Sequence, residues 1–325
     1  MSKVKYKNVK IDPVKFQSDL LRGLKDDIHD MDYNKFKVHY ERIKNKIENA
    51  QGDKISIEEY LDGRHDEGRS LLHWAALWFE NKDLIEYLIN EGANVDHQDG
   101  RLRTPISNAV DNGHIGNVRA LLTNRADPTI PDWTGDTCLH VAAHNDSDEV
   151  IEVLLADGRD TIDKVNKNGA TPVHIAAKYS LHALHAFFHY KSDDAIRLLN
   201  VGDNYGDTPL HYAATAGDSG DAATYLMLLG ADRIKNNKDG VTPIQAAREW
   251  GDEEMVDIIL NFSQDRVLED IDREEGESPA EAYYKHVKSI ADEEAAAYER
   301  IKADLESEAF LELAGEAVFG HEDDS

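Results

Sequence analysis

The chain has 325 residues, of which 41% are hydrophobic and only 8 are proline, a composition typical of folded protein with room for more than one domain. Its net charge of −28 argues against a nucleic-acid ligand, because phosphate backbones are recognised by positively charged surfaces. The single cysteine, Cys138, excludes an internal disulfide framework, and no apolar run reaches the roughly 20 residues that span a bilayer.

The compartment and the distribution of charge follow from the same composition. The start of the chain, MSKVKYKNVK, has no apolar core of a secretory signal, which together with the lone cysteine favours a cytoplasmic location. Residues 1–65 carry 14 basic and 12 acidic residues, residues 66–262 carry 16 and 32, and residues 263–325 carry 6 and 20. The acidic excess indicates either solubility alone or a preference for a partner with a basic contact surface.

Residues 1–65 are predicted to be helical. Asp12 and Pro13 form a cap-and-proline start, and Phe36, Tyr40 and Ile43 recur at the spacing of one helix face. The expected role of this region is to cover an open apolar end of whatever follows it.

Residues 66–262 repeat themselves. Six stretches align on a residue that precedes a proline or its substitute, with spacings of 34, 33, 34, 37 and 34 residues. The aligned residues are Ser70, Thr104, Thr137, Thr171, Thr208 and Thr242. A period near 33 residues is typical of stacked helical repeats, in which one unit cannot bury its apolar face alone.

The stretch NYGDTPLHYAATAGD shows why each unit folds as it does. Thr208 is a good N-cap, and Pro209 suits the first helical position, where its missing N–H removes no bond. Leu210 and Ala213 lie where they can face a neighbouring helix, and Gly217 is expected to end the first helix. A second apolar helix follows in DAATYLMLLGAD, and then a turn leads to the next unit.

These stretches resemble the ankyrin repeat, with its hairpin glycine, T-P-L-H-x-A-A and L-L-x-x-G-A-D. The resemblance implies an all-α ankyrin solenoid of six repeats with short β-hairpin loops. Four departures stand out: Cys138 replaces the third proline, the second hairpin glycine is displaced to Gly100, the 37-residue step makes the fourth unit irregular, and the sixth unit ends the stack.

Residues 263–325 begin with an acidic linker, EDIDREEGES. The sequence SPAE then predicts a helix start with Ser278 as the N-cap and Glu281 completing a capping box. An apolar stripe beginning at Tyr283 continues this helix to about Leu313. The helix either folds back on the repeats or offers a docking surface.

No catalytic or cofactor motif is present: the sequence has no GxxxxGK[ST], HExxH, G-x-S-x-G or G-x-G-x-x-G. Four histidines share one place in their repeats, where the family uses histidine to bond the neighbouring hairpin backbone: His73, His140, His174 and His211. Another three, His182, His185 and His189, form one helical stripe. That stripe is either a solvated face or a zinc- or proton-binding group, and we expect the former, with no metal and no cofactor.

The ankyrin resemblance implies that targets contact the hairpin tips and the exposed ends of the first helices, along the concave face. The residues that fall at those positions and are expected to bind protein are Trp78, Trp133, His144, Tyr179, Tyr205 and Trp250. Tryptophan and tyrosine are over-represented among binding hot spots. Trp78 and Trp250, near the ends of the stack, are alternatively expected to pack beneath the flanking helices.

The sequence therefore predicts a non-enzymatic protein-binding module, with no nucleic-acid or membrane ligand and no indication of oligomeric state. Three alternatives stay open: an acidic inhibitor or immunity-type protein that blocks a basic target, a secreted bacterial effector that acts in a host cytosol, and an enzyme whose site lies in the flanks.

Overall fold

The computed structural model describes residues 33–48, 68–78, 80–159, 162–217, 220–269 and 276–290, with residues 271, 273, 292, 293 and 296. The helix predicted to start at Asp12 and the last part of the predicted C-terminal helix lie outside these residues. The chain divides into two compact units, Met1–Leu260 and Asn261–Ser325. Among the described residues, the long elements are all helices, so the predicted all-α fold is confirmed.

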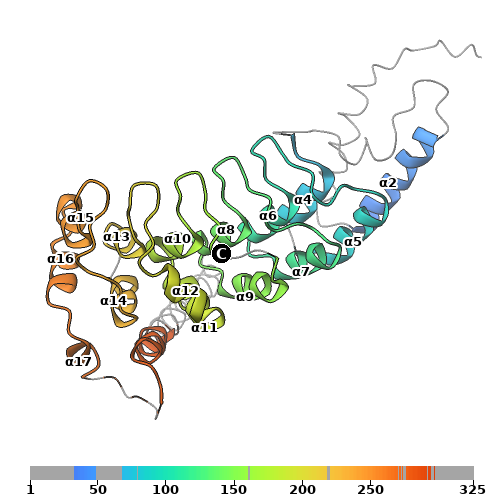
Figure 1. Ribbon diagram of the computed structural model, residues 1–325. Helices are drawn as coiled ribbons and strands as arrows, with labels where there is room; N and C mark the ends of the chain where they lie inside the picture. Colours follow the sequence, from blue (N-terminus) through green and yellow to red (C-terminus); the bar gives the residue numbers. More distant parts are fainter. Residues whose placement is uncertain are drawn as a thin grey trace, which may run out of the picture. The chain divides into compact units, whose positions relative to one another are not determined.

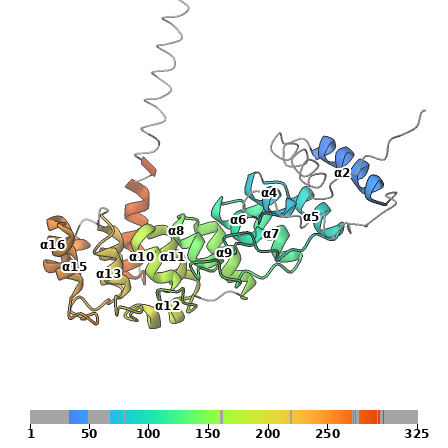
Figure 2. The same cartoon turned by 90° about the horizontal axis from the view of Figure 1, so that it is seen from above.

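The repeats of the first unit are pairs of antiparallel helices stacked in chain order (Figures 1 and 2). The first helices of the pairs are α4 (Leu71–Trp78), α6 (Pro105–Asp111), α8 (Cys138–His144), α10 (Pro172–Tyr179), α13 (Pro209–Ala213) and α15 (Pro243–Trp250). The second helices are α5 (Lys82–Asn90), α7 (Ile115–Thr123), α9 (Asp148–Asp157), α11 (Leu181–Tyr190), α14 (Asp221–Leu228) and α16 (Glu253–Leu260). Loops project side by side from the first-helix row (Figure 1).

Each first helix starts as the sequence predicts. Thr171 is the N-cap of α10, Pro172 occupies the first helical position, and the Nδ1 atom of His174 accepts a hydrogen bond from the Thr171 backbone N–H at 3.1 Å. The opposite ring nitrogen of His174 donates to the Asp207 carbonyl of the next repeat at 3.1 Å. The histidine therefore caps its own helix and fixes the next hairpin, which confirms the structural role expected for this position.

Stacking buries the apolar side chains between neighbouring repeats. First helices contact first helices and second helices contact second helices along the whole row. Leu72, Ile106, Leu139, Val173 and Leu210 are fully buried, whereas Ile244 at the same place in the last repeat is partly exposed. Each such leucine or isoleucine side chain contributes about 1.5–3 kcal/mol to the stack, so the apolar core runs continuously through it.

The fourth repeat carries an additional helix. The 37-residue step is accommodated by α12 (Ser192–Leu198), which directly follows α11. This confirms the predicted irregularity and shows its form.

The helix α2 (Tyr33–Glu48) lies against α5 of the first repeat (Figure 2). The Tyr40 ring meets the Tyr87 ring edge-on at 5.7 Å between centroids, and the Tyr87 hydroxyl donates to Glu41. Lys44 and Glu91 form an ion pair at 2.7 Å. Through these contacts α2 packs against the second helix of the first repeat.

Two local predictions were wrong. The left-handed backbone of the second hairpin falls on Leu102, with φ 57°, and not on Gly100. The helix α13 ends at Ala213, earlier than expected, and Gly217 takes a left-handed conformation only after an intervening turn.

In the second unit, α17 (Gln264–Val267) precedes a helix over residues 279–290. The Ser278 hydroxyl accepts a hydrogen bond from the Glu281 N–H at 3.2 Å, which confirms the predicted start of that helix. Searching the described helices for a stretch both long and apolar enough to cross a bilayer finds none.

Candidate functional site

The hairpin loops are shaped by one repeated side-chain device. In each loop an Asp or Asn side chain accepts hydrogen bonds from two backbone N–H groups further along, at 2.8–3.1 Å. The five residues are Asp99, Asp132, Asn166, Asp203 and Asn237. Short polar side chains that bond their own backbone close tight turns, so every tip has the same preset shape.

Neighbouring tips are also joined by backbone hydrogen bonds. The Trp133 N–H donates to the Arg101 carbonyl at 3.0 Å. In the next three repeats, the N–H group at the same place donates to a carbonyl of the preceding loop at 2.9–3.1 Å; these donors are Lys167, Asn204 and Lys238. The Lys238 ammonium adds a bond to the Asn204 carbonyl at 2.7 Å. The tips therefore form one continuous, ordered edge.

This edge exposes two aromatic rings. Trp133 is 57% exposed and Tyr205 is 60% exposed, although both residues have their backbones fixed by the bonds between and within the loops. Their side chains contribute little to the core. An exposed ring on an ordered loop loses little conformational entropy when a partner buries it.

The ends of the first helices carry a second group of predicted residues. The His144 ring at the end of α8 lies 4.4 Å from the Tyr179 ring at the end of α10, and the Lys178 ammonium lies over the Tyr179 ring at 5.6 Å. Asn145 donates from its amide to the Asp111 carbonyl at 2.9 Å. Contacts thus link the first-helix ends of three successive repeats.

The two predicted tryptophans at the ends of the stack differ. Trp250 is 66% exposed at the end of α15. Trp78 is the last residue of α4, and its side chain lies outside those described. We call Trp133, Tyr205, His144, Tyr179 and Trp250 together the hairpin face.

The histidine stripe on α11 is not a uniform solvated face. His182 bonds the Asp146 carboxylate at 3.2 Å, and Ser180 donates to the same carboxylate. Burial acts to raise the pKa of Asp146, but the hydrogen bonds from His182 and Ser180 lower it. The expectation of a fully solvated stripe was therefore wrong for His182, which joins the third and fourth repeats.

His185 and His189 stack with ring centroids 5.4 Å apart. The other side of α11 is buried through Leu184 and Phe187, as the sequence predicted.

The remaining polar groups of the repeats serve the fold. Burial lowers the pKa of His73 and of His174 to about 4, and it also lowers the pKa of His140. These rings are neutral near pH 7, with both nitrogens engaged by backbone groups. Cys138 is fully buried, so its thiol is not presented to a substrate.

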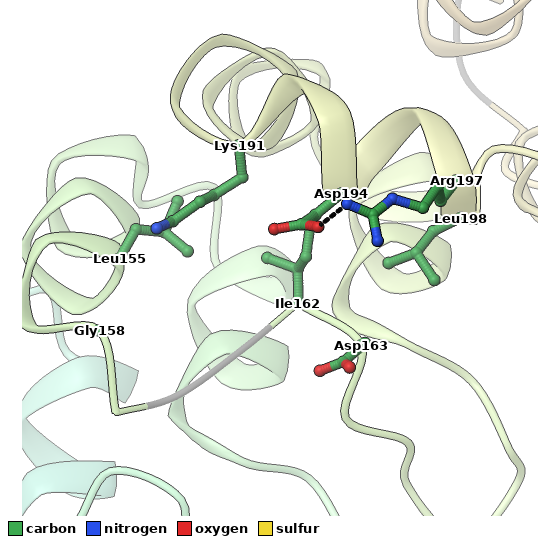
Figure 3. A pocket seen from close by; sticks show the side chains of 8 residues that line it. All are labelled: Leu155, Gly158, Ile162, Asp163, Lys191, Asp194, Arg197 and Leu198. Atoms are coloured by element: carbon green, nitrogen blue, oxygen red, sulfur yellow. Dashed lines mark ion pairs between the residues drawn. The ribbon is translucent and has the colours of Figure 1, made fainter.

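A pocket of about 340 Å³ lies between the end of α9 and α12, on the second-helix side (Figure 3). Leu155, Ile162 and Leu198 give it an apolar lining, and Lys191 extends toward Leu155. Arg197 is paired with Asp194 at 2.7 Å. None of the predicted site residues lines this pocket, which exists because of the additional helix.

Comparison with known proteins agrees with the geometry. The family described as "Ankyrin repeats (3 copies)" matches residues 49–132, 72–164, 106–184 and 139–233. Human palmitoyltransferase ZDHHC13 is 34% identical over 184 residues, covering 56% of this chain and 28% of that protein. Mouse inversin is 31% identical over 228 residues, covering 66% and 21%. The chain thus spans less than a third of the length of these relatives.

Two solved structures are also similar. One is described as the Bd0816 predatory endopeptidase from Bdellovibrio bacteriovorus in complex with immunity protein Bd3460; the matched chain has a TM-score of 0.51 and 25% identity, with 59% of this chain and 97% of that one covered. The other is the ankyrin repeat domain of Bcl-3, with a TM-score of 0.56, 22% identity and coverage of 74% and 97%.

The family match, the solved structures and the repeated cap-and-hairpin geometry all indicate ankyrin repeats. The chain belongs to the ankyrin-repeat family, and its repeats form a protein-interaction module.

Proposed function

We propose that the hairpin face binds a partner protein whose contact surface is basic. The observation that carries this proposal is the exposure of aromatic rings on ordered supports: Trp133, Tyr179, Tyr205 and Trp250 are each 49–66% exposed. The repeats do not need these rings for their own packing. Aromatic side chains held this way are typical binding hot spots.

The negative charge of the repeats supports a partner with a positively charged contact surface. Residues 66–262 carry 32 acidic and 16 basic residues, so the repeats present a net negative field. Such a field accelerates the approach of a basic surface and disfavours an acidic one. The aromatic anchors then set how long the complex lasts, because they are desolvated only after docking.

An inhibitor that blocks a basic target is the second candidate. It is supported by the acidic repeats and by the likeness to a chain of the endopeptidase–immunity protein complex. The two candidates use the same face and differ in whether the bound partner loses an activity.

The test uses affinity capture to identify a binding protein and surface plasmon resonance to measure its kinetics. Trp133→Ala and Tyr205→Ala should each weaken binding by about 1–3 kcal/mol, chiefly through faster dissociation. Tyr190→Ala is the matched control, since Tyr190 is 46% exposed but lies on α11, a second helix. Wild-type affinity in both hairpin variants would show that the partner uses another surface.

A further inference from the structure

The conformation of Leu102 is unusual within the repeats. At the corresponding place, two residues before the aligned Ser or Thr, the other five repeats have glycines with φ between 76° and 87°. Leu102 has φ 57°, a left-handed conformation that costs an L-residue roughly 1–2 kcal/mol. Its side chain is 47% exposed, so burial in the core does not offset that cost.

Leu102 lines a groove of about 720 Å³ that crosses three successive hairpin loops. Ile130 and Pro131 contribute from the next loop, and Val165 contributes from the loop after it. Val165 is 57% exposed, so two large apolar side chains face solvent across one groove. Strained residues held in place by ordered surroundings concentrate at binding sites.

The groove also differs in charge from the surrounding repeats. Lys164 and Lys167 line it, and Asp132 is the acidic residue among its lining. One Asp132 oxygen already accepts bonds from the Thr134 and Asp136 N–H groups. Lys167 donates to the Trp133 carbonyl, whereas Lys164 makes no hydrogen bond or ion pair within the described part of the chain.

We propose that this groove binds an extended protein segment in which an apolar side chain is followed by a carboxylate. The apolar side chain inserts between Leu102 and Val165, and the carboxylate pairs with Lys164. This segment is acidic, whereas the partner surface proposed for the hairpin face is basic. The two proposals can therefore be tested independently.

The experiment measures fluorescence anisotropy of a labelled ten-residue peptide of alternating leucine and glutamate, added to the full chain. Two control peptides replace either every glutamate with lysine or every leucine with serine. The serine peptide lacks the buried leucine, and the lysine peptide lacks the carboxylate that pairs with Lys164, so each should bind about tenfold more weakly. Long-range attraction to a chain of charge −28 would give the opposite order for the lysine peptide.

Variants of the protein locate the binding. Leu102→Gly and Val165→Thr should each weaken binding of the glutamate peptide about tenfold. Leu102→Gly should unfold at the same temperature as wild type or higher, because glycine adopts positive φ without strain. Ile234→Thr is the control, since Ile234 is a 79% exposed side chain of a hairpin-region loop that does not line the groove.

The proposal fails if the glutamate peptide does not saturate the protein, if the lysine peptide binds more tightly, or if Leu102→Gly binds like wild type. Loss of binding in Ile234→Thr equal to that in Val165→Thr would also overturn it. None of these results depends on the partner captured through Trp133 and Tyr205.

Discussion

The side-chain amide of Asn108 is fully buried in α6 and has no hydrogen-bond partner among the described residues. The corresponding position of the next repeat is Val141, and that of the following one is Ile175. A buried amide without partners costs about 1–3 kcal/mol, whereas an apolar side chain of similar size costs nothing comparable. We therefore expect Asn108→Val to stabilise the repeats by about 1–2 kcal/mol.

Urea unfolding followed by circular dichroism measures this change. Asn112→Val is a control, because the Asn112 amide bonds the Asn108 carbonyl at 2.9 Å and its replacement removes a bond that is made. A lower midpoint for Asn108→Val would mean that the amide has a partner, such as an ordered water.

The buried histidines make stability depend on pH. Burial lowers the pKa of His174 to about 4, from about 6.5 in the unfolded chain. Between these values the unfolded chain binds more protons, so stability is complete above pH 6.5 and is lost as pH falls toward 4. The loss is about 1.4 kcal/mol per pH unit for each such histidine.

Replacing His174 with Gln should flatten this dependence. Gln245 occupies the corresponding place in the sixth repeat, where its side-chain oxygen accepts the Thr242 N–H at 2.8 Å, so glutamine can make the cap. Denaturant unfolding at pH 7.5, 6.5 and 5.5 should show that His174→Gln loses about 1 kcal/mol less stability than wild type between pH 6.5 and pH 5.5. Parallel curves for the two proteins would contradict the assignment of the proton to His174.

At the scale of elements, α2 buries two aromatic rings, Phe36 and Tyr40, which stack on each other at 6.1 Å between centroids. Tyr40 is 1% exposed and contacts Tyr87 of α5. Tyr40→Ala should cost about 3–5 kcal/mol, as removal of a buried aromatic ring does. In a stack each repeat contacts only its neighbours, so hydrogen exchange should accelerate in α5 and stay unchanged in α15 and α16.

Val38→Ala provides the control for this experiment, because Val38 is on the same helix but 51% exposed. Equal acceleration of exchange along the whole stack in Tyr40→Ala would show that the repeats unfold as one unit.

The elements also show what can be predicted from sequence. Thr208, Pro209 and His211 determine local bonds within one turn and to the next hairpin, so their repetition revealed the helix pairs and their stacking. The exposed rings of the hairpin face followed from the same register. Hydrogen bonds that are local and recur in every repeat can be predicted from a single sequence.

Features that depend on long-range contacts were not predicted. The left-handed conformation of Leu102 was missed for a different reason: it belongs to a turn closed within its own loop, where the Leu102 N–H donates to the Asp99 carbonyl, but a leucine stands where the other repeats have glycine. The bond between His182 and Asp146 joins residues 36 positions apart. The form of α12 likewise depends on how a three-residue insertion is absorbed between packed helices.

For the whole molecule, the charge imbalance of 64 acidic against 36 basic residues predicts self-repulsion. Raising NaCl from 0.1 to 1 M shortens the screening length from about 10 Å to about 3 Å. The added salt then weakens the repulsion between exposed carboxylates more than it weakens the attraction within the short ion pairs. The midpoint of thermal unfolding should therefore rise with NaCl over this range.

The salt effect has an internal check in Glu249, an exposed carboxylate in the last turn of α15. It sits where the helix dipole is negative, so its charge is unfavourable both locally and within the overall field. Glu249→Gln should raise the midpoint at 0.1 M NaCl by an amount equivalent to about 0.3–1 kcal/mol, and the difference from wild type should nearly disappear at 1 M. Differential scanning calorimetry of both proteins at the two salt concentrations measures this. A midpoint that falls with NaCl, or an advantage of Glu249→Gln that persists at 1 M, would mean that specific ion pairs outweigh the net charge in setting the stability of the stack.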